Sequence, residues 1–170
     1  MISQLAYCDL RTKYGVFQEA LFSDGSKEVI ALYMGELNEA ENVLCRLHSS
    51  CIFGHYFNSA ECSCQEEMIR SQQLIQKAGK GIIILLDQEG KGNGHLALMK
   101  SVPFKRQGMK QADAYVAAGY KKDNRDYSNA IEILKFFNIG SICLLTENTS
   151  KVEMMRNAGI EVSSTKSLGL

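Results

Sequence analysis

The chain has 170 residues, 45% of them apolar and 22% charged, which is enough for one compact domain with a hydrophobic core, expected over residues 1–170. Its 19 basic and 19 acidic residues cancel, which argues against binding to bulk nucleic acid or to an anionic membrane, although a local cluster can still hold a small anion. The longest apolar stretch, GIIILLD, is too short to cross a membrane.

The first part of the chain, residues 4–48, consists of short extended segments separated by turns. The segments are QLAYCDL, GVFQEALF, EVIALYMG and NVLCRLHS. Turn-forming residues stand between them at 13–15 and at 23–26. Strands that follow one another through short turns pair antiparallel, so we expect this part to be mostly antiparallel sheet.

Helices and strands alternate in the rest of the chain. Helical patterns are QEEMIRSQQLIQKAGK, YSNAIEILKFFN and SKVEMMRNAG, and the strands between and after them are GIIILLD, SICLLT and IEVSS. Gly79 and Gly140 stand where the first two helices should end. We therefore predict an α+β fold: a mixed sheet with antiparallel N-terminal strands and C-terminal βαβ-like units, with helices packed around it. Residues 88–126, which hold the only proline, give no regular assignment.

Three cysteines, Cys51, Cys62 and Cys64, are spaced C-x10-C-x-C and could place three thiolates on one metal ion. No fourth ligand is evident from the sequence. Structural zinc sites usually have four protein ligands, whereas catalytic zinc keeps three and a water, so the pattern favours a catalytic zinc site. The alternative is that these cysteines are small buried apolar residues that happen to cluster.

The six cysteines also bear on the compartment of the protein. The N-terminal segment MISQLAYCDLRTKYG lacks the basic segment and the apolar run of a signal peptide. We therefore expect a reducing compartment, the cytoplasm, where metal binding is a better explanation of clustered cysteines than a disulfide.

Two segments could bind an anion. QEGKGNG, residues 88–94, follows a buried strand, where α/β sheets place ligands, and its glycines would let backbone N–H groups approach a phosphate. In LLTENTSK, Thr146 ends a strand and Lys151 lies in the first turn of the next helix. The alternatives are a solvated turn for the first segment and an ordinary helix cap for the second.

Charged and histidine residues give further candidates. In KKDNRDY, Asp123 and Arg125 could act as a proton acceptor and a nucleophile or phosphate clamp, or could simply be a charged helix entry. Arg46 and His48 are two apart on a strand and share a face, which could point toward the metal. His55 and His95 are further possible ligands or acid–base groups.

Five segments resemble, in order along the chain, those of GTP cyclohydrolase II, a family of riboflavin biosynthesis. They are CRLHSSC, the C-x10-C-x-C segment, QEGKGNG, DNRDY and LLTENTSKVE, and the resemblance covers nearly the whole chain. It implies a GTP cyclohydrolase II-like fold and a zinc-dependent cyclohydrolase that opens the imidazole ring of GTP, releasing formate and pyrophosphate. It further implies a Zn²⁺ cofactor, Mg²⁺ with the nucleotide polyphosphate, a small-molecule nucleotide as the partner, and a homodimer.

The resemblance also assigns residues. Cys51, Cys62 and Cys64 would bind zinc, Asp123 would be the proton acceptor, and Arg125 would be the nucleophile toward the α-phosphate. The positions implied to contact the substrate are Arg46, His48, Ser50, Glu67, Glu89, Gly90, Lys91, Gln111, Thr146 and Lys151.

Several positions depart from the family pattern. Val102 stands where a tyrosine assists catalysis, so the proton donor is open, with His55, Tyr115, Tyr120 and Tyr127 as candidates. The other departures are Ser50 for Glu, Glu67 for Gln, Lys91 for Arg and Gln111 for Thr. A carboxylate in place of an amide loses its donors, and lysine in place of arginine loses the planar fork that grips phosphate.

Three functions are therefore open. The leading hypothesis is cyclohydrolase activity on GTP. The second is a zinc hydrolase of the same fold that acts on another nucleotide or heterocycle in a specialised pathway. The third is a non-catalytic nucleotide-binding homologue in which zinc is structural.

Overall fold

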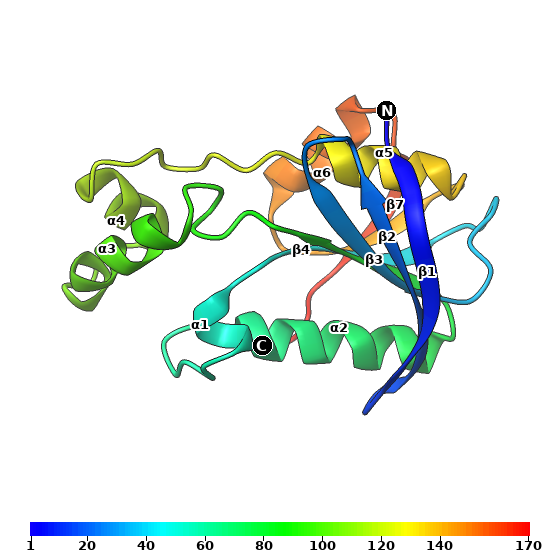
Figure 1. Cartoon of the computed structure of the whole chain (residues 1–170), viewed down its shortest axis with the longest axis horizontal. Coiled ribbons are helices and arrows are strands. Elements are labelled where there is room, and N and C mark those ends of the chain that lie inside the picture. Colours follow the sequence, from blue (N-terminus) through cyan, green and yellow to red (C-terminus); the bar gives the residue numbers. More distant parts are fainter.

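The computed structural model describes all residues, 1–170, and contains a seven-stranded mixed sheet in the order β1-β2-β3-β5-β4-β6-β7 (Figure 1). The strands are β1 (Ser3–Thr12), β2 (Gly15–Ser23), β3 (Glu28–Met34), β4 (Val43–Ser49), β5 (Gly81–Leu86), β6 (Ile142–Leu145) and β7 (Val162–Lys166). The helices are α1 (Ile52–His55), α2 (Cys64–Ala78), α3 (His95–Arg106), α4 (Gln111–Ala117), α5 (Ser128–Phe136) and α6 (Thr149–Asn157). None of these helices is long and apolar enough to span a membrane.

The antiparallel half of the sheet follows the predicted turns. β1, β2 and β3 pair antiparallel with one another, and β3 pairs antiparallel with β5. The fourth N-terminal segment differs, because β4 is parallel to both β5 and β6. The connection from β4 to β5 runs through α2, and a crossover helix of this kind joins parallel strands. The expected α+β fold with a mixed sheet is confirmed.

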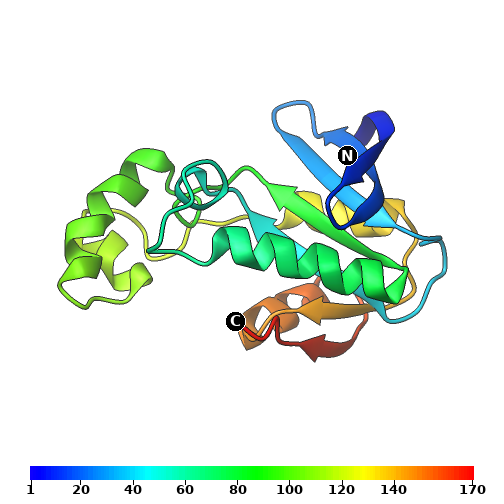
Figure 2. The ribbon, with the colours of Figure 1, turned by 90° about the horizontal axis from the view of Figure 1, so that it is seen from below.

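Helices cover both faces of the sheet (Figure 2). Alternating residues of β5 point to opposite sides: Ile82 and Ile84 belong to the main core with α5 and α6, whereas Ile83 packs with Ile75 of α2. Helix α2 ends at Gly79, whose φ of 71° is left-handed as the sequence predicted. The β6–α6–β7 unit is parallel, which confirms the expected C-terminal βαβ-like unit.

The segment that the sequence left unassigned forms two further helices, α3 and α4. These pack mainly on each other and project away from the sheet (Figure 1). Pro103 lies inside α3, a position where proline removes a backbone donor and usually interrupts a helix. The helical hairpin was not predicted from the sequence because α3 contains a proline and follows a glycine-rich segment.

Candidate metal centre and cavity

The three cysteines converge at the junction of α1 and α2. Cys51 is the N-cap residue of α1, and Cys64 is the first residue of α2. The Sγ atoms of all three lie within 4.8 Å of one another, and those of Cys51 and Cys62 are 4.0 Å apart. All six cysteines of the chain are free thiols.

Gly54 allows this convergence because it has no side chain. A Cβ atom at this position would lie 2.9 Å from the Sγ of Cys62 and 3.0 Å from the Cβ of Cys64. The Gly54 N–H also donates to the Cys51 sulfur at 3.4 Å. The first turn of α1 is thus packed directly against the sulfurs.

The thiol cluster fits a zinc ion. Sulfurs each about 2.3 Å from a tetrahedral zinc are roughly 3.8 Å apart, close to the separation of Cys51 and Cys62. Burial raises the pKa of Cys51 and Cys64, so without a metal these thiols are held protonated. A bound cation reverses this preference because it deprotonates coordinating thiols. These three residues could therefore hold a metal with one coordination position left for another ligand.

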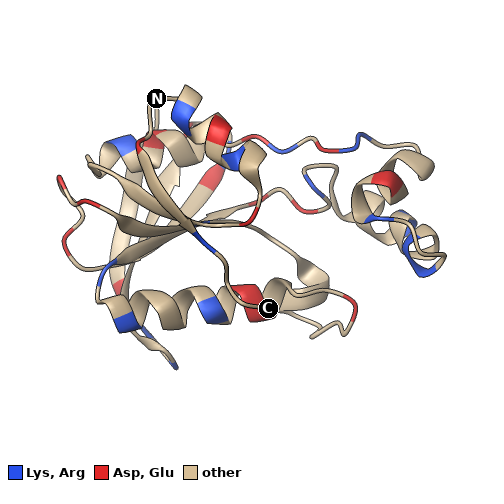
Figure 3. Ribbon diagram, turned by 180° about the vertical axis from the view of Figure 1, so that it is seen from behind, with Lys and Arg blue, Asp and Glu red and all other residues tan.

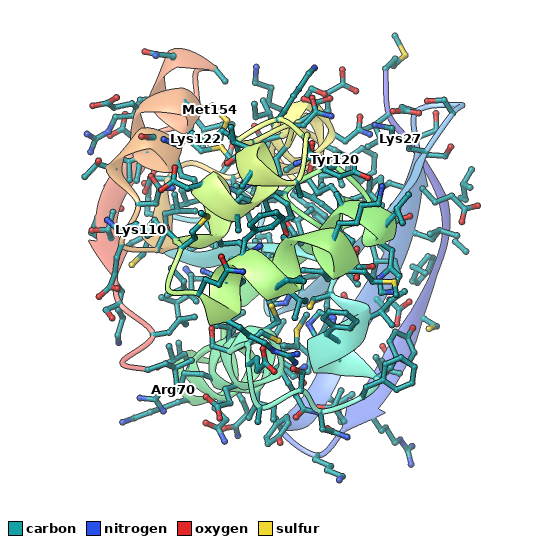
Figure 4. All side chains as sticks on the ribbon, turned by 90° about the vertical axis from the view of Figure 1, so that its left-hand side faces the viewer. Lys27, Arg70, Lys110, Tyr120, Lys122 and Met154 are labelled. Atoms are coloured by element: carbon teal, nitrogen blue, oxygen red, sulfur yellow. The ribbon has the colours of Figure 1, made fainter.

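The cysteines line a cavity of about 420 Å³, which is the size of a small-molecule site. The cavity lies between the sheet, the α1–α2 junction and the α3–α4 hairpin; Figure 4 looks onto the molecule from the side of this hairpin. The predicted site residues that line it, besides the cysteines, are Arg46, His48, Ser50, Glu67, Gly90, Lys91, Gln111, Arg125 and Lys151.

Three cations of the cavity lining, Arg46, Arg125 and Lys151, lie close to one another. Lys151 and Arg125 lie on the Tyr127 ring, with Nζ 5.6 Å and Cζ 5.8 Å from its centroid. Burial lowers the pKa of Lys151 to about 8, and the charges of Arg46 and Arg125 add to this effect. Three cations held this close to one another favour an anionic ligand.

Arg46 is tied into the sheet and to α2. Its Nη1 donates to the Leu145 carbonyl at 2.8 Å, and its Nη2 forms an ion pair with Glu67. The second carboxylate oxygen of Glu67 accepts from the Ser63 hydroxyl at 2.9 Å. Both oxygens of Glu67 are therefore occupied by protein donors.

Asp123 and Arg125 form a side-on ion pair. Arg125 donates from Nε to Oδ1 of Asp123 at 2.9 Å and from Nη2 to Oδ2. Burial would raise the pKa of Asp123, but the hydrogen bonds from Arg125 outweigh it, and the pKa is lowered. Arg125 lines the cavity, whereas Asp123 does not. The carboxylate is thus placed to hold or take a proton of the guanidinium.

The glycine-rich loop positions this pair. The Lys91 carbonyl accepts from the Asn124 N–H at 2.8 Å, and the Gly92 carbonyl accepts from the Asn124 amide at 3.1 Å. A Cβ atom on Gly92 would lie 2.4 Å from the Asn124 carbonyl oxygen. The connection from α4 to α5, which carries basic and acidic residues in alternation (Figure 3), is therefore docked on the loop.

Besides Asp123, two predicted residues do not line the cavity. The Glu89 side chain is 8% exposed and accepts from the Ile52 N–H at 3.2 Å and from Nδ1 of His95 at 2.6 Å, so it supports α1 and α3. Thr146 lies in a neighbouring cavity on the other side of the Arg46–Glu67 pair, and its hydroxyl accepts from the Asn148 N–H.

Other residues line the cavity that the sequence did not single out. Lys105 and Arg106 reach it from the end of α3, and Arg106 pairs with Glu61 at 2.6 Å across the cavity rim. No pattern identified them because α3 was not predicted. Of the four proton-donor candidates, Tyr115 lines the cavity, whereas His55, Tyr120 and Tyr127 do not.

Comparison with known protein families gives one consistent result. Residues 3–167 match the family model described as GTP cyclohydrolase II. The chain is 35% identical over 163 residues to the GTP cyclohydrolase-2 of Neisseria meningitidis serogroup A, a match that covers 95% of this chain and 83% of that protein. Identity to the GTP cyclohydrolase-2 of Actinobacillus succinogenes is 33%, with coverage of 95% and 75%.

Longer proteins also match. The chain is 38% identical over 156 residues to the riboflavin biosynthesis protein RibBA of Porphyromonas gingivalis, and the match covers 91% of this chain but 38% of that protein. Among solved structures, RibBX, a two-domain 3,4-dihydroxy-2-butanone 4-phosphate synthase from A. baumannii, superposes with a TM-score of 0.54 at 11% identity. That match covers 98% of this chain and 39% of RibBX, and at this identity it concerns the fold alone.

Proposed function

The chain belongs to the GTP cyclohydrolase II family, and we propose that it is a zinc-dependent hydrolase that opens the imidazole ring of GTP with release of formate and pyrophosphate. This activity acts on the C–N bonds of a cyclic amidine and would serve riboflavin biosynthesis. One observation carries the proposal: three thiols that fit a zinc ion share a cavity with Arg46, Arg125 and Lys151. A nucleotide combines a heterocycle, on which the metal centre would act, with a polyphosphate, which the cations would bind.

Zinc held by Cys51, Cys62 and Cys64 would supply a Lewis acid that makes water more acidic next to the ring carbon to be attacked. The base would lie beside the sulfurs, and the apolar side chains of Phe53, Leu98 and Val102, which also line the cavity, would pack against it. Ring opening needs a proton on the departing nitrogen. We assign this donor role to the Tyr115 phenol, because it lines the same cavity and burial raises its pKa to about 12, so that it keeps its proton at neutral pH.

The polyphosphate would lie along the cations. Lys151 and Arg46 would neutralise its charge, and Lys91, on the glycine-rich loop, would add a further ammonium group. Arg125 would attack the α-phosphate, with Asp123 accepting the guanidinium proton through the hydrogen bonds that already join them. Mg²⁺ would bind the nucleotide's phosphates rather than a set of protein ligands.

A second candidate is a zinc hydrolase that acts on a different nucleotide. The Glu67 carboxylate supports it, because Arg46 and Ser63 already occupy both its oxygens, whereas the family pattern expects an amide there. Val102 supports it too, since it lines the cavity without any proton to give. The two candidates share the metal centre and differ in what the cavity recognises.

The test is to incubate the zinc-loaded protein with GTP and magnesium and to measure formate and pyrophosphate. We expect both products from the wild-type protein and neither from Cys62→Ser. Cys8→Ser is the matched control, because Cys8 is an exposed thiol on β1 and should keep zinc and activity. Zinc-loaded protein that binds GTP but releases no formate would overturn the assignment to GTP, and a panel of other nucleotides would then decide the second candidate.

The setting of the enzyme is part of the proposal. We propose that residues 1–170 act as one catalytic domain, that the cytoplasm keeps the three thiols reduced, and that two copies of the chain form a homodimer. The homodimer is supported by β1, a ten-residue edge strand with exposed apolar side chains.

A further inference from the structure

An exposed aromatic side chain borders the cavity on the loop that joins α1 to α2. Tyr56 and Phe57 follow one another at the start of this loop, and they are 77% and 72% exposed. Single exposed apolar side chains are common on protein surfaces, and Tyr56 is one of them. Phe57 differs because it also lines the cavity, which Tyr56 does not. Its free surface is therefore available to a ligand that binds there.

Hydrogen bonds fix the loop around Phe57. The Ser59 N–H donates to the Phe53 carbonyl at 2.9 Å. Asn58, whose φ of 53° is left-handed, accepts at its Oδ1 from the side-chain amide of Gln65 at 2.6 Å. The exposure of Phe57 is thus a feature of the folded loop. A ligand that contacts a preformed surface of this kind pays little for ordering it.

The same segment carries two of the three cysteines of the metal centre. Phe57 lies between Cys51 and Cys62 in the sequence, and the rings of Phe53 and Phe57 line the cavity together with these sulfurs. The Phe53 ring already packs edge-on against that of His95, with centroids 5.3 Å apart. Phe57 makes no ring contact within the chain. It is therefore the lining phenylalanine whose faces are not used by the protein itself.

We propose that Phe57 stacks on the heterocycle of the bound nucleotide, while the cations of the cavity hold its phosphates. Stacking requires only a flat face, so Phe57 contributes affinity for a planar base without choosing among bases. That choice would be left to groups that hydrogen-bond to the edge of the base. The identity of the ligand as a nucleotide rests on the proposed function; the unused ring of Phe57 does not.

A fluorescent substitution tests the contact directly. The chain contains no tryptophan, so Phe57→Trp introduces a single indole at this position. A purine that stacks on an indole quenches its fluorescence. We expect GTP to quench the emission of zinc-loaded Phe57→Trp protein, read in a stopped-flow instrument before the first turnover. Tyr56→Trp is the matched control, because it places the indole on the neighbouring residue outside the cavity.

The two indoles should respond differently at a GTP concentration that calorimetry shows to be saturating. Phe57→Trp should be strongly quenched and should bind GTP at least as tightly as the wild type, whereas the emission of Tyr56→Trp should change little. Unquenched emission of Phe57→Trp at saturation overturns the stacking role. Equal quenching of both variants overturns it too, because the effect would then come from absorption by GTP or from the loop as a whole.

Truncation of the ring separates binding of the base from binding of the phosphates. Phe57→Ala should weaken binding of GTP and of inosine triphosphate by the same factor, about fivefold to 100-fold, which is the usual effect of removing one stacking ring. Binding of inorganic pyrophosphate, which has no base, should not change, and neither should the zinc content. Tyr56→Ala should leave all of these at the wild-type level. A loss confined to GTP, or an equal loss for pyrophosphate, overturns the proposal.

Failure of this proposal is distinct from failure of the proposed function. Formate release from GTP by the wild-type protein, together with an unquenched Phe57→Trp indole, leaves the function intact and removes the stacking role. Quenching of Phe57→Trp by GTP without any formate release by the wild-type protein leaves the stacking role intact and removes the function.

Discussion

Lys151 is the cation whose charge depends most on its surroundings. It shares the cavity with Arg46 and Arg125, and Glu67 and Asp123 are the nearby carboxylates that partly offset them. Because burial and the two arginines lower its pKa to about 8, a large fraction of free protein loses this charge in mildly alkaline solution. The anion-binding strength of the cavity should therefore change with pH in a range where arginines do not titrate.

We predict that GTP affinity falls as the pH rises through about 8, since the protonated form of Lys151 binds the polyphosphate. The decrease should approach about tenfold per pH unit above the pKa, as expected for one required proton. Titration calorimetry at several pH values measures it. Lys151→Arg keeps its charge throughout this range, so its affinity should be flat there; the same slope in Lys151→Arg would assign the effect to another group.

Tyr115 should matter through its hydroxyl rather than its ring. We predict that Tyr115→Phe lowers kcat for formate release by about 100-fold or more, the usual contribution of a general acid, with zinc content unchanged. Tyr120→Phe is the matched control, because Tyr120 lies outside the cavity and stacks with Lys100. Equal kcat values in Tyr115→Phe and wild type would contradict the assignment of Tyr115 as the proton donor and would favour water in that role.

At the scale of the elements, the site depends on two close approaches of backbone. Gly54 brings α1 onto the sulfurs, and Gly92 brings the glycine-rich loop onto the segment of Asp123 and Arg125. A methyl group at Gly54 should disturb the metal centre and leave the segment of Asp123 and Arg125 in place, and a methyl group at Gly92 should do the reverse.

We predict that Gly54→Ala weakens zinc binding by about tenfold or more, because the added Cβ would displace the Cys62 sulfur. Competition with a chelator of known affinity measures it. Gly25→Ala is the control: its Cβ meets nothing within 4 Å, but its φ of +94° makes the substitution strained. Gly25→Ala should lower the melting temperature without changing zinc affinity, and equal zinc loss in both variants would contradict the local explanation.

Gly92→Ala should have the opposite signature. Its Cβ would lie 2.4 Å from the Asn124 carbonyl, and its φ of +80° already disfavours a side chain, so the segment of Arg125 must move. We predict that zinc content stays at the wild-type level while pyrophosphate release falls by about 100-fold, in line with the cost of misplacing a reacting group. Gly92→Ala protein that loses zinc instead would show that the two halves of the site are not independent.

The elements differ in how well the sequence predicts them. The alternation of apolar and polar residues predicted β1, β2 and β3, and Gly79 predicted the end of α2. These features depend on the conformational preferences of residues that are close together in the sequence. The parallel pairing of β4 was not predicted, because the strand itself contains no signal of its partner. The α3–α4 hairpin was not predicted, because a proline such as Pro103 usually interrupts a helix. Lys105 and Arg106, which lie on α3 and line the cavity, were therefore not predicted either.

The site shows the same limit. The spacing of Cys51, Cys62 and Cys64 is local and predicts their convergence, which the structure shows. The contact of His48 with His55 joins residues that were noted singly, and the support of α1 by Glu89 depends on how the 88–94 loop folds back. Such contacts depend on tertiary packing, which one sequence does not encode in any short pattern.

At the scale of the whole molecule, the sheet has one long free edge. β1 pairs only with β2, and nearly all of its side chains are exposed, among them Leu5 at 57% and Tyr7 at 73%. Long apolar edge strands tend to associate unless another chain covers them. None of the residues lining the cavity comes from β1, so this edge and the site are separate parts of the molecule.

We predict that the wild-type protein sediments as a dimer and that Leu5→Lys combined with Tyr7→Lys shifts it to a monomer, because lysines on an edge strand oppose pairing with a second edge. Val116→Lys is the control: Val116 is 54% exposed on α4, so the change of polarity is similar but lies away from β1. Sedimentation velocity over a range of concentrations measures the association. A wild-type monomer at every concentration, or dissociation of the Val116→Lys protein as well, would contradict the role of β1. Since the cavity is built within one chain, the monomeric variant should keep its zinc and its kcat.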